Sequence, residues 1–257
     1  MPVPLYAGGG QPKLSPQFIP WGGIMGTTIS FKRTDGKETQ GYLAKAGRDH
    51  APGIIVIQEW WGLQEQIKGI CDRLARAGYE ALAPDLYGGV AVSYHDSAKA
   101  DREMASLDFL DATDNIVRGA AQYLGKSGVK VGLMGFCLGG AVTILGAVRV
   151  PEIAAACCFY GIPPREAAKV EDVKVPFQGH FANADDWCTP AAVDALEKSM
   201  HGAGVIGQVY RYDAAHAFMN EQRDVHDRAA TELAWERMLD FWTAHLGALR
   251  GSGPNWF

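Results

Sequence analysis

Reactive side chains follow several short apolar runs of this sequence. Glu59 comes directly after "GIIVIQ", and Cys137 comes directly after "VGLMGF". His216 follows "VIGQVYRYDAA", while Asp185 and Asp186 stand side by side after "VPFQGHFANA". A cysteine, a carboxylate and a histidine in this chain order can carry out acyl transfer, in which the thiol attacks, the imidazole moves protons and the carboxylate orients the imidazole. The pattern makes Cys137 a candidate nucleophile.

The heptapeptide "MGFCLGG" places Cys137 between Gly135 and Gly139, after a strand-like run and before the helix-like "AVTILGAV". A nucleophile held in a sharp strand-to-helix turn needs small flanking residues. The N-terminus of the following helix favours a thiolate over a thiol. The backbone N–H of Leu138, together with that of Trp60, would form an oxyanion hole. Taken alone, the motif leaves open that Cys137 is only a small apolar residue in a tight turn.

The histidine and the acid raise the case for catalysis. His216 is the histidine that falls between the last strand-like run and the last helical pattern, where a base would be expected. Asp185 and Asp186 are both placed to orient it, and the pattern does not choose between them.

Strand-like and helical segments alternate along most of the chain. The stretch 27–46 alternates apolar and polar residues around "TDGK" and predicts a β-hairpin. Apolar runs followed by helical patterns then repeat, and a long helix is expected over about 98–124. This order predicts an α/β fold with a mostly parallel sheet, helices on both faces and the hairpin at one edge. Because ligands bind at the carboxyl ends of such strands, the loops that carry the candidate residues should meet.

Composition limits the classes of protein. The chain of 257 residues has a net charge of −5, which argues against a nucleic-acid partner, and no apolar run long enough for a membrane span. We expect an irregular extension over 1–26, a single domain over 27–250, and a cytoplasmic location because the start lacks a secretory signal. Five cysteines without a C-x-x-C pair indicate neither a disulfide framework nor a metal site, and no cofactor is expected. A monomer or a homodimer is expected.

The chain resembles the dienelactone hydrolase family of α/β-hydrolases, whose nucleophile is a cysteine. The resemblance rests on "IIVIQEWWGL", "LARAGYEALAPDLYGG", "VGLMGFCLGG", "HFANADDWCTP" and "HAFMNE" followed by "AWERMLDFW", which together span about 27–246. It implies an α/β-hydrolase fold, a small ester or lactone substrate and a triad of Cys137, Asp185 and His216, with Asp186 as the alternative acid. It also implies that Glu59 pairs with the resting thiol and takes its proton when substrate binds, which would protect the cysteine from oxidation.

The sequence departs from the family pattern where arginines hold the substrate carboxylate. Gly89 and Asn220 stand at the corresponding positions, and spacing does not show whether Arg223 or Arg102 substitutes. Without a cation there, a bound carboxylate would lose charge-assisted hydrogen bonds. Aromatic side chains on the same loops predict a largely apolar pocket, which we expect to include Trp61, Tyr87, Trp187 and Phe218.

These observations leave several functions open. The first is a cysteine-dependent hydrolase that cleaves an ester or lactone through an acyl-enzyme. A general carboxylesterase or thioesterase acting on a neutral substrate would use the same residues. A catalytically silent binding protein is disfavoured because it would not need the complete triad. A thiol redox protein would need a resolving cysteine, for which Cys188 is the candidate.

Overall fold

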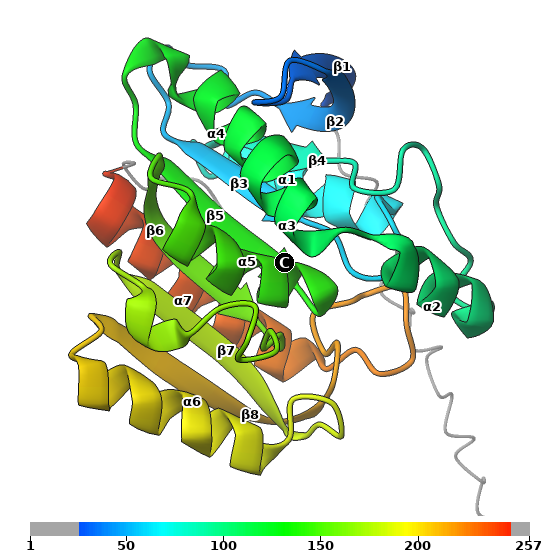
Figure 1. Cartoon of the computed structure of the whole chain (residues 1–257), viewed down its shortest axis with the longest axis vertical. Coiled ribbons are helices and arrows are strands. Elements are labelled where there is room, and N and C mark those ends of the chain that lie inside the picture. Colours follow the sequence, from blue (N-terminus) through cyan, green and yellow to red (C-terminus); the bar gives the residue numbers. More distant parts are fainter. Residues whose placement is uncertain (1–25, 248–257) are drawn as a thin grey trace, which may run out of the picture.

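The computed structural model describes residues 26–247. They form an eight-stranded sheet with the order β1-β2-β4-β3-β5-β6-β7-β8, flanked by helices (Figure 1). The extension expected over 1–26 lies outside the described residues except for Gly26, and so do residues 248–250 of the expected domain. Among the described residues, no helix is long and apolar enough to cross a membrane.

The sheet has the predicted mixture of strand directions. The hairpin of β1 (Thr27–Lys32) and β2 (Glu38–Ala44) lies at one edge, and β2 runs antiparallel to β4 (Glu80–Pro84). From β4 onward neighbouring strands are parallel. These further strands are β3 (Gly53–Ile57), β5 (Val131–Phe136), β6 (Ile153–Phe159), β7 (Phe177–Ala184) and β8 (Gly207–Ala215). Their carboxyl ends therefore lie at the same edge of the sheet, as predicted.

The central strands are apolar on both faces because helices cover both faces. In β3, Ile54 and Val56 pack into the core on one side, while Ile55 and Ile57 pack into the core on the other. A strand with a single polar face could not occupy this central place without burying that face. Such runs of branched apolar residues are what made the strands visible in the sequence.

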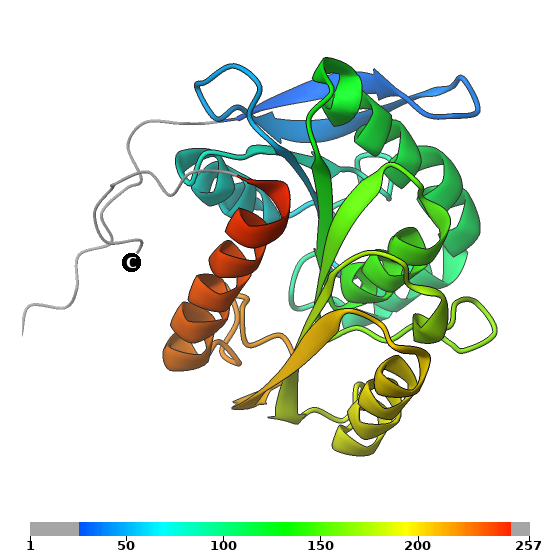
Figure 2. The ribbon, with the colours of Figure 1, turned by 90° about the vertical axis from the view of Figure 1, so that its left-hand side faces the viewer.

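Helices lie on both sides of the sheet, as Figure 2 shows. One side carries α1 (Glu65–Arg76) and α7 (Arg228–Leu246), and the other carries α4 (Arg118–Leu124), α5 (Leu138–Arg149) and α6 (Pro190–Ala203). Trp235 and Trp242 of α7 are almost completely buried against the first side. The predicted α/β architecture is confirmed.

The prediction of one continuous helix over 98–124 is wrong. The chain instead forms α2 (Ser97–Ser106), the short α3 (Phe109–Asp111), a π-helical segment (Ala112–Val117) and α4. Leu107 is extended, with ψ of 123°, and the Asp108 carboxylate accepts hydrogen bonds from the N–H groups of Leu110 and Asp111. Asp108 thus caps a new helix where the periodic pattern alone continues the old one. Leu110, in the short α3, is 45% exposed.

Candidate active site

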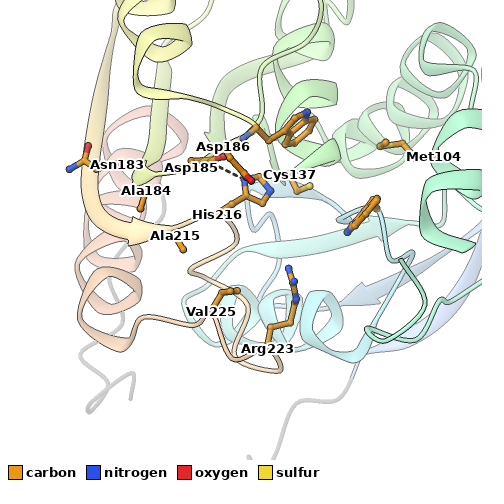
Figure 3. Close-up of a pocket in the computed structure, with 12 residues that line it drawn as sticks. Met104, Cys137, Asn183, Ala184, Asp185, Asp186, Ala215, His216, Arg223 and Val225 are labelled. Atoms are coloured by element: carbon orange, nitrogen blue, oxygen red, sulfur yellow. Dashed lines mark hydrogen bonds and ion pairs between the residues drawn. The ribbon is translucent and has the colours of Figure 1, made fainter. Parts of the chain in front are cut away.

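The loops that carry the candidate residues meet at the carboxyl edge of the sheet. Glu59 follows β3 by two residues, Cys137 directly follows β5, Asp185 follows β7 and His216 follows β8. The pairing of Ile57 with Gly135, and of Ala184 with Ala215, brings the ends of these strands to one level. Segments far apart in the sequence are in this way adjacent in space (Figure 3).

Cys137 occupies a strained turn at the start of α5, with φ of 56° and ψ of −118°. The turn needs glycine at positions 135 and 139 because other backbone atoms lie very close to both residues. A Cβ atom on Gly135 would lie 2.2 Å from the carbonyl oxygen of Gly139, and one on Gly139 would lie 2.5 Å from that of Ile57. A non-glycine residue in the left-handed region is costly, and such strain concentrates at functional sites. The geometry is that of a nucleophile elbow.

The histidine and one of the two acids form a close pair. His216 Nδ1 lies 2.7 Å from Asp185 Oδ2, as the dashed line in Figure 3 marks. The other oxygen of Asp185 accepts hydrogen bonds of 2.9 Å from the N–H groups of Trp187 and Cys188. Asp185 is 4% exposed, whereas Asp186 is exposed at the wall of the pocket. The structure therefore brings Asp185 to the imidazole.

The contact between His216 and Asp185 determines which ring nitrogen of the imidazole carries a proton. Burial raises the pKa of the Asp185 carboxyl, but the hydrogen bond and charge of His216, with the N–H groups of Trp187 and Cys188, outweigh it and leave the pKa below its ordinary value. An ionised carboxylate only accepts hydrogen bonds, so Nδ1 of His216 carries a proton, and in the neutral form of the ring the lone pair is therefore on Nε2. A neutral imidazole of this form can take a proton at Nε2.

Burial keeps the Cys137 thiol protonated at rest, although the helix N-terminus by itself favours a thiolate. Burial raises the pKa of the thiol well above its ordinary value, and the charge of Glu59 raises it further. Hydrogen bonds from the N–H groups of Leu138 and Trp60 lower the pKa but do not offset burial. The helix end contributes a favourable field, yet the side chain is only 7% exposed and lacks the solvation that a thiolate needs.

Glu59 lies behind the thiol and is 3% exposed. Its Oε2 accepts a 2.7 Å hydrogen bond from Asn220 Nδ2, and its Oε1 accepts a 3.4 Å hydrogen bond from the Tyr160 hydroxyl. Burial raises the pKa of this carboxyl above its ordinary value. The hydrogen bonds from Asn220 and Tyr160 and the charges of His216 and Arg223 reduce this rise without cancelling it. Neither Asn220 nor Tyr160 was a predicted partner of Glu59, because nothing in the sequence pattern links loops so far apart.

A cavity of about 760 Å³ opens beside these groups. Apolar side chains form most of its wall, with polar and charged groups at the catalytic end and the rim. The apolar lining residues are Trp60, Met104, Ala184, Trp187, Ala215 and Val225. Met104 comes from α2 and Val225 from the loop before α7, and neither position carried a signal of function in the sequence.

Of the four aromatic residues expected in the pocket, the structure places Trp187 in the wall of the cavity and the other three elsewhere. Trp187 lines the cavity, is 46% exposed and packs edge-on against His216 with ring centroids 5.3 Å apart. The structure places Trp61 behind Trp60, where it is 2% exposed. Phe218 is completely buried against Tyr160. The partly buried Tyr87 packs against the apolar core that lies beneath α4 and α5.

The positions at which the resemblance implied arginines hold no charge here. Gly89 lies in a turn with φ of +98°, and its N–H donates to Asp85 Oδ2. Asn220 is buried and engaged with Glu59. Arg223 lines the cavity and its guanidinium lies 5.4 Å from the ring centroid of Trp61, whereas Arg102 is exposed on α2. Arg223 is therefore the arginine that the structure brings to the pocket.

Among residues 26–247, no group of three or more histidine, cysteine, aspartate and glutamate side chains could hold a metal ion. All five cysteines are free and buried. Cys188 was the candidate resolving cysteine, and it lies 2% exposed in the turn that follows Asp185.

Comparisons with known proteins show the family of this chain. A model of the dienelactone hydrolase family matches residues 39–246. Protein usf of Aquifex pyrophilus is 35% identical over 233 residues, which cover 86% of this chain and 100% of that protein. A protein of Aquifex aeolicus, provisionally assigned as a carboxymethylenebutenolidase, is 34% identical with the same coverage.

A solved structure shows the same fold. A provisionally assigned dienelactone hydrolase from Klebsiella pneumoniae subsp. pneumoniae matches with a TM-score of 0.74 at 24% identity, covering 85% of this chain and 100% of that one. The family match spans most of the described residues and includes every loop of the candidate site. The chain belongs to the dienelactone hydrolase family, whose members are hydrolases that act on ester or lactone bonds.

Proposed function

We propose that this hydrolase uses Cys137 as its nucleophile and cleaves an ester or lactone through an acyl-enzyme. The observation that carries the proposal is the 2.7 Å contact between His216 and Asp185 beside a cysteine with positive φ, whose thiol meets two backbone N–H groups. Those donors, from Leu138 and Trp60, are suitable for the oxyanion of a tetrahedral intermediate. The same arrangement would be an unusual coincidence in a protein that only binds a ligand.

The first half-reaction forms a thioester. The Cys137 thiol gives its proton to Glu59, and the thiolate attacks the carbonyl carbon of the ester. The oxyanion that forms is held by the N–H groups of Leu138 and Trp60. The bond between the carbonyl carbon and the alcohol oxygen then breaks, and the leaving alkoxide receives the proton that the thiol gave up.

The second half-reaction consumes water. His216 Nε2 takes a proton from a water molecule as its oxygen adds to the thioester carbonyl. The carbon–sulfur bond then breaks, and the imidazolium returns the proton to the cysteine sulfur. Asp185 stabilises the imidazolium in between because it holds Nδ1 and stays ionised.

The pocket favours esters with an apolar group. Its volume and its wall of Trp60, Met104 and Trp187 suit an aromatic or branched acyl or alcohol part. Gly89 and Asn220 offer no cation, so a small anionic lactone would have to rely on Arg223. A general carboxylesterase acting on neutral substrates is the second candidate, and the same two positions favour it.

Trapping the acyl-enzyme tests the mechanism. In His216→Ala, p-nitrophenyl acetate should leave one acetyl group on the peptide that contains Cys137, because the second half-reaction is blocked. Cys137→Ala should lose at least about a hundredfold of p-nitrophenyl butyrate hydrolysis. Cys71→Ala, which removes a buried cysteine from α1, is the matched control. Hydrolysis by Cys137→Ala at the wild-type rate would refute the nucleophile.

A further inference from the structure

Both polar atoms of the buried Asn220 carboxamide are hydrogen-bonded. Its Oδ1 accepts the N–H of Gln222 at 3.1 Å, which fixes the orientation of the amide. Nδ2 must then point the other way, where it donates to Glu59 Oε2 at 2.7 Å and to the Tyr94 hydroxyl at 3.5 Å. Asn220 itself is completely buried. An interior amide whose oxygen and nitrogen are both bonded has one preferred orientation, and it constrains the carboxylate that it binds.

Glu59 needs such a donor to exist as a carboxylate. It is 3% exposed, and a carboxylate without hydrogen bonds or a cation would take up a proton in such a place. Its two hydrogen-bond donors, Asn220 and Tyr160, are both neutral, and the one from Asn220 is shorter by a wide margin. The titratable or charged groups that face Glu59 are Cys137, Tyr94, Tyr160, His216 and Arg223.

We propose that Asn220 is a positioning residue that holds Glu59 near the Cys137 thiol and favours its ionised form, which can take the thiol proton. This inference rests on the proposed function, because it assigns Asn220 a role in the proton transfer from Cys137 to Glu59. Asn220 does not touch the reacting atoms. It acts through Glu59, and it stands on the loop that also carries His216, so one loop supplies the imidazole and sets the base for the thiol.

Asn220→Asp is the sharpest perturbation. The substitution keeps the shape and the acceptor for the Gln222 N–H, but it places a second carboxylate where the amide now donates to Glu59. Two carboxylates at that distance share one proton, so the pair stays protonated to a higher pH. The acid-side midpoint of kcat/KM against pH should rise by at least about one unit, and kcat/KM below that midpoint should fall about tenfold or more.

Two other variants test whether the size of the midpoint shift depends on which hydrogen bond to Glu59 is removed. Asn220→Leu removes the donor without adding a charge and should also move the midpoint to higher pH. Tyr160→Phe removes the longer hydrogen bond and should move it less. Gln208→Glu makes the same change from amide to carboxylate on an exposed residue at the start of β8, and the midpoint should move far less than in Asn220→Asp. Thermal unfolding of each variant shows whether it is folded at the assay temperature.

The Glu59→Gln background separates positioning from a structural role. If Asn220 acts through Glu59, then Asn220→Asp should cause no further midpoint shift when Glu59 is already glutamine. A midpoint that stays at the wild-type value in Asn220→Asp and Asn220→Leu overturns the inference, and so does an equal shift in the Glu59→Gln background. If Cys137→Ala also keeps the wild-type rate, the proposed function itself has failed, which is a different result.

Discussion

His180 is a buried histidine beneath the candidate site, and it makes stability depend on pH. It lies on β7, with the loop of Asp185 after it, and it is completely buried. Its Nδ1 lies 2.7 Å from the Tyr212 hydroxyl on β8, and its Nε2 lies 2.9 Å from Gln178 Oε1. Because an amide oxygen only accepts, Nε2 carries the proton and Nδ1 accepts from the tyrosine. The ring also stacks on Phe159 with centroids 4.5 Å apart.

The direction of the pH dependence of stability follows from the direction in which folding shifts the pKa of His180. Burial, with the charge of Arg237 adding to it, lowers the pKa of His180 to about 3 in the folded protein. In the unfolded chain the pKa is about 6.5, so below that pH the unfolded state binds more protons. The stability that His180 contributes is present in full above about pH 6.5 and is lost as the pH falls toward 3. Each pH unit in this window costs about 1.4 kcal/mol, so a fall from pH 7.5 to 5 costs about 2 kcal/mol.

Urea unfolding of the wild type and of His180→Gln at about pH 7.5 and about pH 5 measures the contribution of His180 to the pH dependence of stability. The variant lacks the titrating group, so its free energy of unfolding should fall by about 2 kcal/mol less between the two pH values. Its absolute stability is lower at both, but the other titrating groups are common to both proteins and cancel in the difference. An identical pH dependence in the two proteins would refute the claim that His180 is neutral when folded.

The remaining predictions concern the elbow and the choice of acid. Asp185→Asn should lower kcat by roughly 10²- to 10⁴-fold because the imidazole loses its proton-fixing partner, whereas Asp186→Asn should change kcat by less than about tenfold. Gly139→Ala should destabilise the protein by about 1–3 kcal/mol in urea unfolding, because its Cβ would meet two backbone carbonyl oxygens at 2.5 Å. Gly69→Ala in α1, where a Cβ meets nothing within 4 Å, should instead stabilise it by about 0.5–1 kcal/mol.

The architecture could be predicted because burial on both faces leaves a strong mark on the sequence. Continuous runs such as "GIIVIQ" and "VGLMGF" have no polar side to present to water, so they must be central strands. Once parallel strands are placed, the loops that leave them must meet at one edge, whatever the strand order. The elbow was equally visible because Gly135 and Gly139 are required by backbone contacts that no other residue allows.

Other features depend on three-dimensional contacts that a pattern does not contain. Asp185 and Asp186 are adjacent, and only the direction in which the chain leaves β7 decides which one reaches His216. The break at Leu107 went unrecognised because the apolar period continues through it, although Asp108 is a good capping residue. A resting thiol was implied by the family resemblance and not by the residue pattern, because the field of the helix end is local, whereas the loss of solvation depends on everything packed around the sulfur.

The neutral amide at position 220 affects which substrates this chain can favour. All of its polar atoms are engaged with Glu59, Tyr94 and Gln222, so a substrate anion could bind there only by breaking those contacts. An anion that binds at Arg223 would lie on the pocket wall, and it would leave the amide in place. If Asn220→Asp shifts the pH profile as expected, the base for the thiol is prepared by a fixed neutral donor and not by a charge that the substrate brings. Neutral esters then need no anionic group to be hydrolysed, in keeping with the apolar wall of the cavity.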